Sequence, residues 1–300
     1  MRRLVGFPVD NADLVKPANK LTPGTRKFKM LKQRIITAVL LIAPFLATLF
    51  YLPHVAMTAI FGLVTVLAAR EWAILSQLRG SGVTIYASVV VLLGLLIIYF
   101  KTSHTWALVL ALIFWSVVFY LIRQKQQNPE RTVPRWMLLF SGLAVLPLCW
   151  LSLEVLLQQP GGRILILMLF LTIWTADSGA YFIGRAFGRR KLADNISPGK
   201  SIEGAIGGLL LVLPISWIMA KWVLGLSLLP SIIWALAMLL PAIYSIAGDL
   251  FESIIKRQAG VKDSGNLLPG HGGIMDRCDS VFAAAPVFSL IALGYAVHSA

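Results

Sequence analysis

The sequence predicts an all-α, polytopic integral membrane protein with about nine transmembrane helices and a cytoplasmic N-terminus. Of its 300 residues, 58% are hydrophobic and only 13% are charged, whereas soluble domains carry about 25% charged residues. The mean hydropathy is +0.79. The apolar residues form runs of about 20, and a helix of that length crosses the ~30 Å hydrocarbon layer of a bilayer. These observations predict a chain that folds within a membrane.

The N-terminal residues differ in composition from the rest of the chain. Residues 1–31 are polar and basic, and they lack the apolar stretch and small-residue cleavage site of a signal peptide. We expect a disordered basic tail there. Residues 32–300 are expected to form a single transmembrane domain.

Nine apolar spans follow the tail. They lie at residues 33–53, 55–77, 83–100, 104–122, 136–157, 163–185, 203–223, 228–255 and 279–298. Each span is long enough to cross a bilayer as a helix. An odd number of crossings puts the two ends of the chain on opposite sides of the membrane.

Positive charge is distributed unequally between the two sides of these spans. With the N-terminus inside, all but three of the 27 Lys and Arg residues fall on the cytoplasmic side, the exceptions being Lys101, Arg163 and Lys221. This distribution satisfies the positive-inside rule. With one span added or removed, the positive residues would no longer fall on one side. The net charge of +14 is therefore interpreted as setting topology and meeting anionic lipid or nucleotide phosphate. We expect no nucleic-acid partner.

The cysteines and histidines argue against several kinds of site. Cys149 and Cys278 are the only cysteines, too few for a disulfide framework or a zinc site. His54, His104 and His298 are all predicted to lie on the outer side. A Ser-His-Asp grouping with residues of the cytoplasmic side is therefore not expected.

The inner end of the eighth span carries the first candidate site. Asp249, Glu252, Ser253 and Lys256 have the spacing i, i+3, i+4 and i+7, which places them on one face of a helix. One interpretation is an ordinary helix end with an acid–base pair. The other is a strip of carboxylate, hydroxyl and ammonium groups that binds a metal and a phosphate.

The loop that follows, residues 262–280, is rich in glycine and acidic residues. Glycines let the backbone approach a ligand and turn its N–H groups toward phosphate. Asp276 and Asp279 can point into one site, and such hard oxygen ligands suit Mg²⁺. The plainer alternative is a flexible loop before a helix whose dipole Asp279 stabilises. His271 is interpreted as a phosphate contact.

The sixth span contains a carboxylate, Asp177. A charged side chain within a membrane costs about 2.5–3.5 kcal/mol on insertion scales, so it should face a polar cavity or a cation. A purely structural pair with Arg185 is the alternative interpretation.

The loop after the sixth span imitates the end of a P-loop in its sequence Gly199-Lys200-Ser201. Asp194 occupies the position of the required first glycine, and no strand is expected before it, so a P-loop NTPase is rejected. What remains is a Ser/Lys/Gly turn leading into a helix N-terminus, an arrangement suited to anions. Ser197 could equally be only a turn residue.

The segment from Ser253 to Asp279 resembles a known signature. It reads Ser-Ile-Ile-Lys-Arg, four residues, Lys-Asp, four further residues, and then Leu-Pro-Gly-His-Gly-Gly-Ile-Met-Asp-Arg-Cys-Asp, which resembles the signature of the phosphatidate cytidylyltransferases. The resemblance covers roughly residues 30–300 and is strongest after residue 170. Cys278 stands where the family usually has an aliphatic residue or Thr.

The resemblance implies a Mg²⁺-dependent enzyme that transfers CMP from CTP to phosphatidate and releases pyrophosphate. It also implies a homodimer in the bacterial inner membrane, a cytoplasmic active site, and in some members a monovalent cation such as K⁺. Residues 32–300 would then be the catalytic domain.

The site assignments follow from this resemblance together with the residue chemistry. The expected catalytic residues are Asp249, Asp276, Lys256 and Ser253. The expected metal ligands are Asp249 and Asp276, supported by Asp279. The expected substrate-binding residues are Ser197, Lys200, Arg257, Lys262, His271 and Asp177.

Two other functions remain as alternatives. A related lipid kinase, such as one acting on a polyprenol, would use similar chemistry. A transporter is a weaker alternative, because its polar residues should cluster at the bilayer midplane in inverted repeats. A CDP-alcohol phosphatidyltransferase is not expected, since its Asp-Gly-rich signature is missing.

Overall fold

The structure, a computed structural model, describes residues 43–100, 104–267 and 272–299. The chain divides into two units, of which the first ends at Leu52 and contains a helix at residues 43–51. The second unit begins at Pro53 and carries every element considered below. The predicted tail, residues 1–31, and the first part of the predicted first span, residues 33–42, lie outside the described residues.

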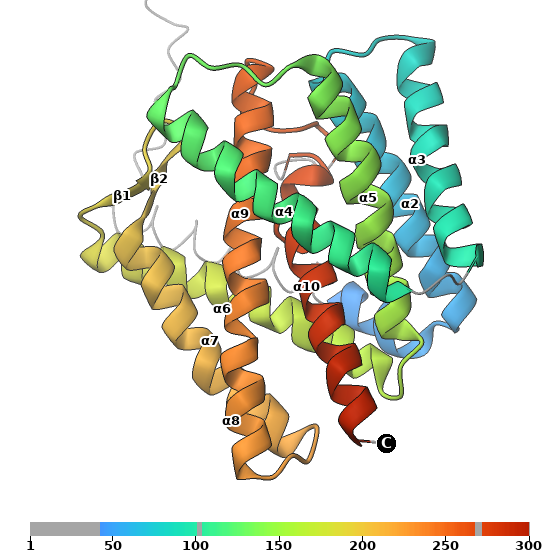
Figure 1. The fold of residues 1–300 in the computed structure, drawn as a ribbon, viewed down its shortest axis with the longest axis vertical. Coiled ribbons are helices and arrows are strands. Elements are labelled where there is room, and N and C mark those ends of the chain that lie inside the picture. Colours follow the sequence, from blue (N-terminus) through green and yellow to red (C-terminus); the bar gives the residue numbers. More distant parts are fainter. Residues whose placement is uncertain (1–42, 101–103, 268–271, 300) are drawn as a thin grey trace, which may run out of the picture. The chain divides into compact units, whose positions relative to one another are not determined.

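The second unit is almost entirely helical (Figure 1). Its elements are α2 (His54–Leu75), α3 (Ser81–Phe100), α4 (His104–Gln127), α5 (Arg135–Leu157), α6 (Gly162–Phe187), β1 (Lys191–Ala193), β2 (Ser197–Ser201), α7 (Ile202–Trp222), α8 (Leu228–Ala237), α9 (Leu239–Gln258) and α10 (Met275–Ser299). Within the described residues, eight helical segments are long and apolar enough to cross a membrane, with α8 and α9 counted as one. The prediction of an all-α, polytopic membrane protein is confirmed.

The predicted spans from 55–77 onward each coincide with one of these segments to within a few residues. The predicted span 228–255 is interrupted at Met238, where α8 gives way to α9. The cause is Pro241, which has no N–H to donate to the carbonyl of Ala237 and therefore breaks the helical hydrogen-bond pattern.

A small β-hairpin lies between α6 and α7, and the sequence analysis did not predict it. β1 and β2 pair in antiparallel fashion, and β2 contains Gly199, Lys200 and Ser201. The expectations of a turn at these residues and of no strand before them are therefore wrong. Two short strands of largely polar residues show no apolar alternation, which is the signal that identifies a strand in a sequence. The expected helix N-terminus is confirmed, because α7 begins directly after Ser201.

Helices α6 and α7 approach each other closely through glycines. A Cβ atom added to Gly208 would overlap the backbone carbonyl of Ala176, and one added to Gly179 would lie 2.9 Å from the Cα of Gly208. Small residues at a helix interface within a membrane allow this close backbone contact. The contact brings α7 against the part of α6 that carries Asp177.

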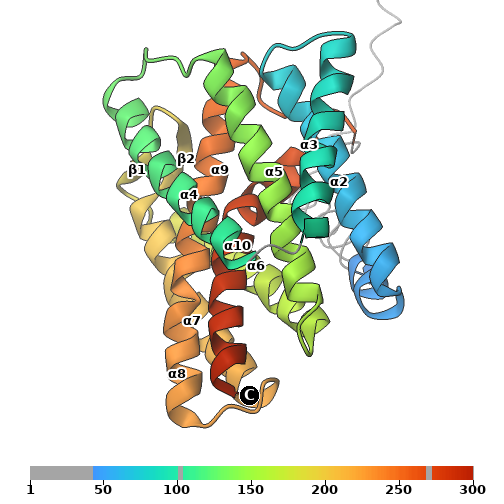
Figure 2. The ribbon, with the colours of Figure 1, turned by 45° about the vertical axis from the view of Figure 1, so that its right-hand side comes forward.

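Helices α9 and α10 lie side by side in both views (Figures 1 and 2). A Cβ atom on Gly248 would overlap the carbonyl oxygen of Asp279, so this glycine allows α9 to contact the first turns of α10. Asp249 is the next residue along α9. The packing therefore places the acidic end of α9 beside the acidic start of α10.

We expect Gly208→Ala to lower the free energy of unfolding by about 1–3 kcal/mol, because the added methyl group must push α7 away from α6. The measurement is the thermal unfolding midpoint of the purified protein in detergent. Gly82→Ala in α3 is the matched control, since a Cβ there would make only ordinary van der Waals contact, 3.6 Å from the Leu78 side chain. Equal midpoints for the two variants would contradict the proposed role of Gly208.

Candidate active site

A cavity of about 360 Å³ opens between α6, β2, α7 and α9. Asp177 on α6, Lys200 on β2 and Asp249 on α9 all line it, so three of the residues assigned from the sequence lie around one space. Tyr181 and Arg185 line the cavity as well, and Nη1 of Arg185 donates to Oη of Tyr181 at 3.0 Å. A ligand in this cavity can therefore meet two basic side chains, Arg185 and Lys200, and two carboxylates.

Lys200 and Asp249 form an ion pair at this cavity. Nζ of Lys200 lies 2.5 Å from Oδ2 of Asp249, and both side chains are half-buried. The other carboxylate oxygen, Oδ1, accepts a long hydrogen bond of 3.5 Å from Oγ of Ser253, one turn further along α9. The ammonium of Lys200 therefore neutralises the predicted metal ligand in this state of the protein.

The base of the hairpin is fixed by Glu203 in the first turn of α7. Its carboxylate accepts hydrogen bonds from the backbone N–H groups of Arg189 and Arg190, and it forms an ion pair of 3.0 Å with Nε of Arg190. Oγ of Ser201 caps α7 by accepting from the N–H of Gly204 at 3.1 Å. These contacts hold the strand that presents Lys200 to the cavity.

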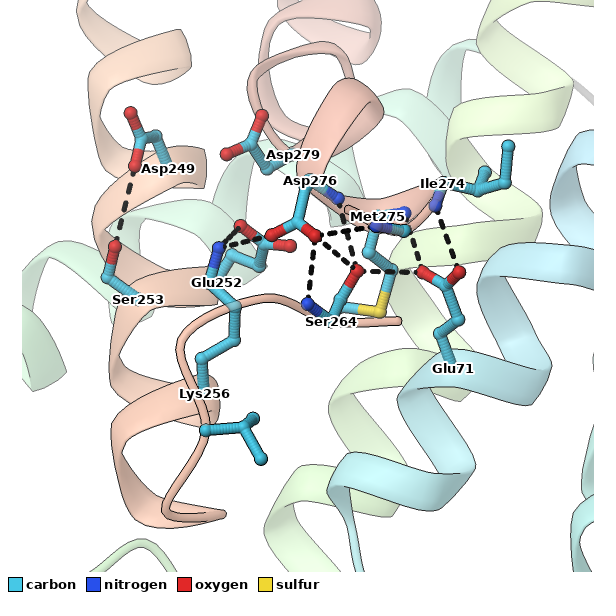
Figure 3. Close-up of polar contacts among 12 residues, drawn as sticks. Glu71, Asp249, Glu252, Ser253, Lys256, Ser264, Ile274, Met275, Asp276 and Asp279 are labelled. Atoms are coloured by element: carbon cyan, nitrogen blue, oxygen red, sulfur yellow. Dashed lines mark hydrogen bonds and ion pairs between the residues drawn. The ribbon is translucent and has the colours of Figure 1, made fainter. Parts of the chain in front are cut away.

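A second group of charges lies between α9 and α10 (Figure 3). Nζ of Lys256 is 2.6 Å from Oε2 of Glu252 and 2.6 Å from Oδ1 of Asp276. The side chains are 13%, 3% and 9% exposed, respectively. One buried ammonium therefore bridges two buried carboxylates and connects α9 to α10.

The loop before α10 wraps around the carboxylate of Asp276. Its Oδ2 accepts hydrogen bonds from the N–H of Ser264 at 2.8 Å, from Oγ of Ser264 at 2.9 Å and from the N–H of Gly273 at 2.8 Å (Figure 3). Gly272, with φ of 80°, supplies the left-handed backbone that this turn requires. The N–H of Gly273 thus serves a carboxylate of the protein, although the sequence analysis had assigned such groups to a phosphate.

Asp279 lies between the two groups of charges. It belongs to the first turns of α10, its Oδ1 accepts from the N–H of Ser280 at 2.7 Å, and the charges of Asp249 and Glu252 both act on it. Three acidic side chains from α9 and α10 are therefore close enough to repel one another. Such an arrangement is stable when positive charge compensates it or when one of the carboxyl groups is protonated.

Comparison with known proteins decides the family. The model of the Cytidylyltransferase family matches residues 32–293. The chain belongs to this family. Its relatives include proteins named phosphatidate cytidylyltransferase from Pseudomonas aeruginosa, 41% identical over 265 residues that cover 87% of this chain and 97% of the relative, and from Haemophilus influenzae, 36% identical over 286 residues that cover 87% and 98%.

A third relative with the same name, from Synechocystis, is 35% identical over 290 residues that cover 87% of this chain and 96% of the relative. These comparisons confirm the resemblance drawn from the segment between Ser253 and Asp279. The cytidylyltransferase is therefore an enzyme of the nucleotidyltransferase class.

The donor groups of this cytidylyltransferase suit a hard divalent cation. Oε1 of Glu252 is buried and accepts no hydrogen bond from a described N–H or hydroxyl group, while the Glu252 carboxyl interacts directly with that of Asp279 and feels the charge of Asp276. Carboxylate oxygens are the ligands that Mg²⁺ takes. Within residues 43–100, 104–267 and 272–299, however, no three His, Cys, Asp or Glu side chains already converge as a ligand set. The carboxylates present are of the chemical type that Mg²⁺ binds.

The remaining residues assigned from the sequence lie away from the cavity or outside the description. Arg257 is exposed, and its Nη1 donates to the carbonyl of Val261 at 3.5 Å. Lys262 is exposed, and Ser197 lies at the start of β2 and is not part of the cavity lining. His271 falls within residues 268–271, which are outside the described residues, so its assignment stays a prediction.

Sequence reasoning considered Arg185 only as a structural partner of Asp177 and gave Tyr181 no role, yet both residues line the cavity. It missed altogether one residue that contacts the site. Glu71 on α2 contacts the loop that holds Asp276 (Figure 3). Its only signal in the sequence is a carboxylate inside an apolar span, which requires a partner.

Proposed function

We propose that the protein transfers CMP from CTP to the phosphate of phosphatidate, giving CDP-diacylglycerol and pyrophosphate for phospholipid synthesis. The family match and the names of the relatives support this reaction. The observation that carries the proposal is the joining of α9 to α10 by Lys256, Glu252 and Asp276 beside a cavity lined by Lys200 and Asp249. Basic groups suited to a nucleotide polyanion and carboxylates suited to a divalent cation thus lie close together, and two of them, Lys256 and Asp276, belong to the signature segment.

The reaction requires alignment and charge neutralisation. A phosphatidate oxygen attacks the α-phosphorus of CTP, a new P–O bond forms, and the bond from that phosphorus to the bridging oxygen of pyrophosphate breaks. The attacking oxygen is already ionised at neutral pH, so positioning and electrostatic stabilisation matter more than a strong base. In this proposal Lys200 and Arg185 bind phosphate oxygens in the cavity. Lys200 leaves Asp249 when it does so.

Lys256 has a different role in this proposal. Because its ammonium is engaged by Glu252 and Asp276, it holds the acidic residues in place and contributes its charge from the edge of the site. Ser253 is placed one turn from Asp249 to orient that carboxylate. The acyl chains of phosphatidate stay in the bilayer.

Magnesium is the expected cofactor, held by Asp249 and Asp276 with support from Asp279. When bound, it would neutralise the phosphates of CTP and the charge that develops on pyrophosphate. A K⁺ ion beside it and a homodimeric assembly are further proposals that rest on the family resemblance. The cytoplasmic orientation of the site rests on the distribution of Lys and Arg, and its location in a bacterial inner membrane rests on the family resemblance.

The test uses CTP labelled with ³²P at either the α or the γ position, together with phosphatidate and the purified protein in detergent micelles. We expect a labelled lipid from α-labelled CTP and none from γ-labelled CTP. A lipid kinase would give the reverse result when supplied with a polyprenol. Absence of a labelled lipid from α-labelled CTP would contradict the proposed function.

A further inference from the structure

Glu71 on α2 is a buried carboxylate with partners far away in the sequence. The residue is 8% exposed, and Ser264 lies 193 positions further along the chain. Its Oε1 accepts from the N–H of Ile274 at 2.9 Å, and its Oε2 accepts from the N–H of Met275 at 2.9 Å and from Oγ of Ser264 at 2.8 Å (Figure 3). Three donors of one loop thus converge on one side chain of another helix.

These contacts cap the N-terminus of α10 from outside. The first N–H groups of a helix have no partner within the helix, and a negative charge placed there is stabilising. The N–H of Met275, the first residue of α10, and that of Ile274 just before it both point to Glu71. The position of the start of α10 is therefore set by α2.

The same contacts continue to the candidate active site. Oγ of Ser264 lies 2.8 Å from Oε2 of Glu71 and 2.9 Å from Oδ2 of Asp276. Asp276 in turn forms the 2.6 Å ion pair with Lys256, which also binds Glu252. A continuous series of polar contacts therefore runs from α2 through the loop to α9.

Two glycines of the loop make room for this carboxylate. A Cβ atom on Gly265 would lie 2.7 Å from Oε1 of Glu71, and one on Gly273 would overlap both Oγ of Ser264 and the Glu71 carboxylate. Any larger residue at either position would push Glu71 away from the loop. Part of the glycine content of the signature is thus explained by Glu71.

We propose that Glu71 is a positioning residue that fixes Asp276 and Asp279 relative to Asp249 and thereby sets the affinity of the site for its divalent cation. The inference rests on the proposed function for its kinetic consequence only. Its structural consequence, the order of the start of α10, can be measured without any substrate. Residues that hold metal ligands typically change metal affinity or activity by about 10- to 100-fold when replaced.

The central variant is Glu71→Gln. Its amide keeps the shape of the side chain, but its NH₂ group must face the N–H of Ile274 or the donors at the other oxygen, so at least one acceptor is lost. We expect the Mg²⁺ concentration for half-maximal activity to rise about 10- to 100-fold, with kcat also lowered and the KM for phosphatidate unchanged.

Glu154→Gln is the matched control. Glu154 is also buried in an apolar helix, and it accepts from Oγ1 of Thr58 at 2.7 Å and from Nε2 of Gln158 at 2.9 Å, with His54 at 2.6 Å. Glu154 lies near the C-terminal end of α5, about 28 Å along the helix axis from Arg135 at the N-terminal end. We expect this variant to lower thermal stability as Glu71→Gln does while leaving the Mg²⁺ dependence unchanged.

A substrate-free measurement uses the thiol of Cys278, which lies between Asp276 and Asp279. In a Cys149→Ala background, maleimide should modify Cys278 about tenfold or more faster in Glu71→Gln than in the parent protein, because a buried donor left unpaired raises the population in which the start of α10 is locally open. Glu154→Gln should leave this rate unchanged. Ser264→Ala removes only the hydroxyl between the carboxylates of Glu71 and Asp276. It should raise both the rate of Cys278 modification and the Mg²⁺ requirement. This variant replaces Glu71→Gln in the test if Glu71→Gln does not fold.

The outcomes separate the two proposals. The role of Glu71 would be overturned if Glu71→Gln changed neither the Mg²⁺ dependence nor the labelling of Cys278. It would also be overturned if Glu154→Gln changed both to the same extent. If the parent protein makes no CDP-diacylglycerol while Cys278 labelling still responds only to Glu71→Gln and Ser264→Ala, the proposed function fails and the positioning of α10 by Glu71 stands.

Discussion

Asp276→Asn is expected to lower kcat for CDP-diacylglycerol synthesis by at least about 10³-fold, the effect of losing a group that stabilises the transferring phosphate. The substitution removes one negative charge from the site, weakens the 2.6 Å ion pair with Lys256 and puts an amide NH₂ against the N–H donors of Ser264 and Gly273. The measurement is the initial rate with saturating CTP and phosphatidate. Membrane insertion of the variant is expected to be unchanged.

The control for this prediction is Glu130→Gln. Glu130 is an exposed acid between α4 and α5, outside the signature segment and without an assigned role, so its replacement should change kcat by less than about threefold, as for surface substitutions in general. Wild-type turnover by Asp276→Asn, in protein shown to be inserted and folded, would defeat the assignment of this residue.

Lys256→Met is expected to destabilise the protein by about 3–5 kcal/mol and to abolish activity. The substitution leaves the carboxylates of Glu252 and Asp276, which are 3% and 9% exposed, without the ammonium between them, and removing one partner of a buried ion pair has this cost. The measurement is the unfolding midpoint in detergent. Lys262→Met, at an exposed lysine, is the control for stability alone.

A double variant separates lost charge from lost packing. Glu252→Gln combined with Lys256→Met removes one of the two unpaired carboxylates, so part of the lost stability should return. If the double variant were no more stable than Lys256→Met, the instability would come from the lost packing of the lysine chain instead.

The transmembrane helices could be predicted from the sequence because length and apolarity alone determine them. Eight segments of the described chain satisfy both conditions. The interruption at Met238 was missed although Pro241 indicates it, because the apolar run continues through the proline. The β-hairpin was missed because its short, largely polar strands carry no periodic signal.

The candidate site could be predicted only in part, for a physical reason. Asp249, Ser253 and Lys256 share one helical face, so spacing along α9 was informative. The partners of these residues depend on tertiary packing: Lys200 reaches Asp249 from the hairpin, and Asp276 reaches Lys256 from the next helix. No local pattern records such contacts.

Glu71 shows the limit of sequence reasoning most clearly. The signature between Ser253 and Asp279 was correctly associated with the family, yet one of the side chains that holds its loop comes from α2. A carboxylate in an apolar span predicts that some partner exists, but it does not say which one. Only the packing of α2 against the start of α10 identifies that partner.

The central claim is that acidic residues of α9 and α10 share one divalent cation with the nucleotide. Crystals grown with CTP and Mn²⁺ in place of Mg²⁺ test it directly through the anomalous scattering of manganese. We expect one peak at coordination distance, about 2.1 Å, from a carboxylate oxygen of Asp249 and from one of Asp276 or Asp279. A manganese ion bound by residues of only one of these helices, or away from both, would contradict the account.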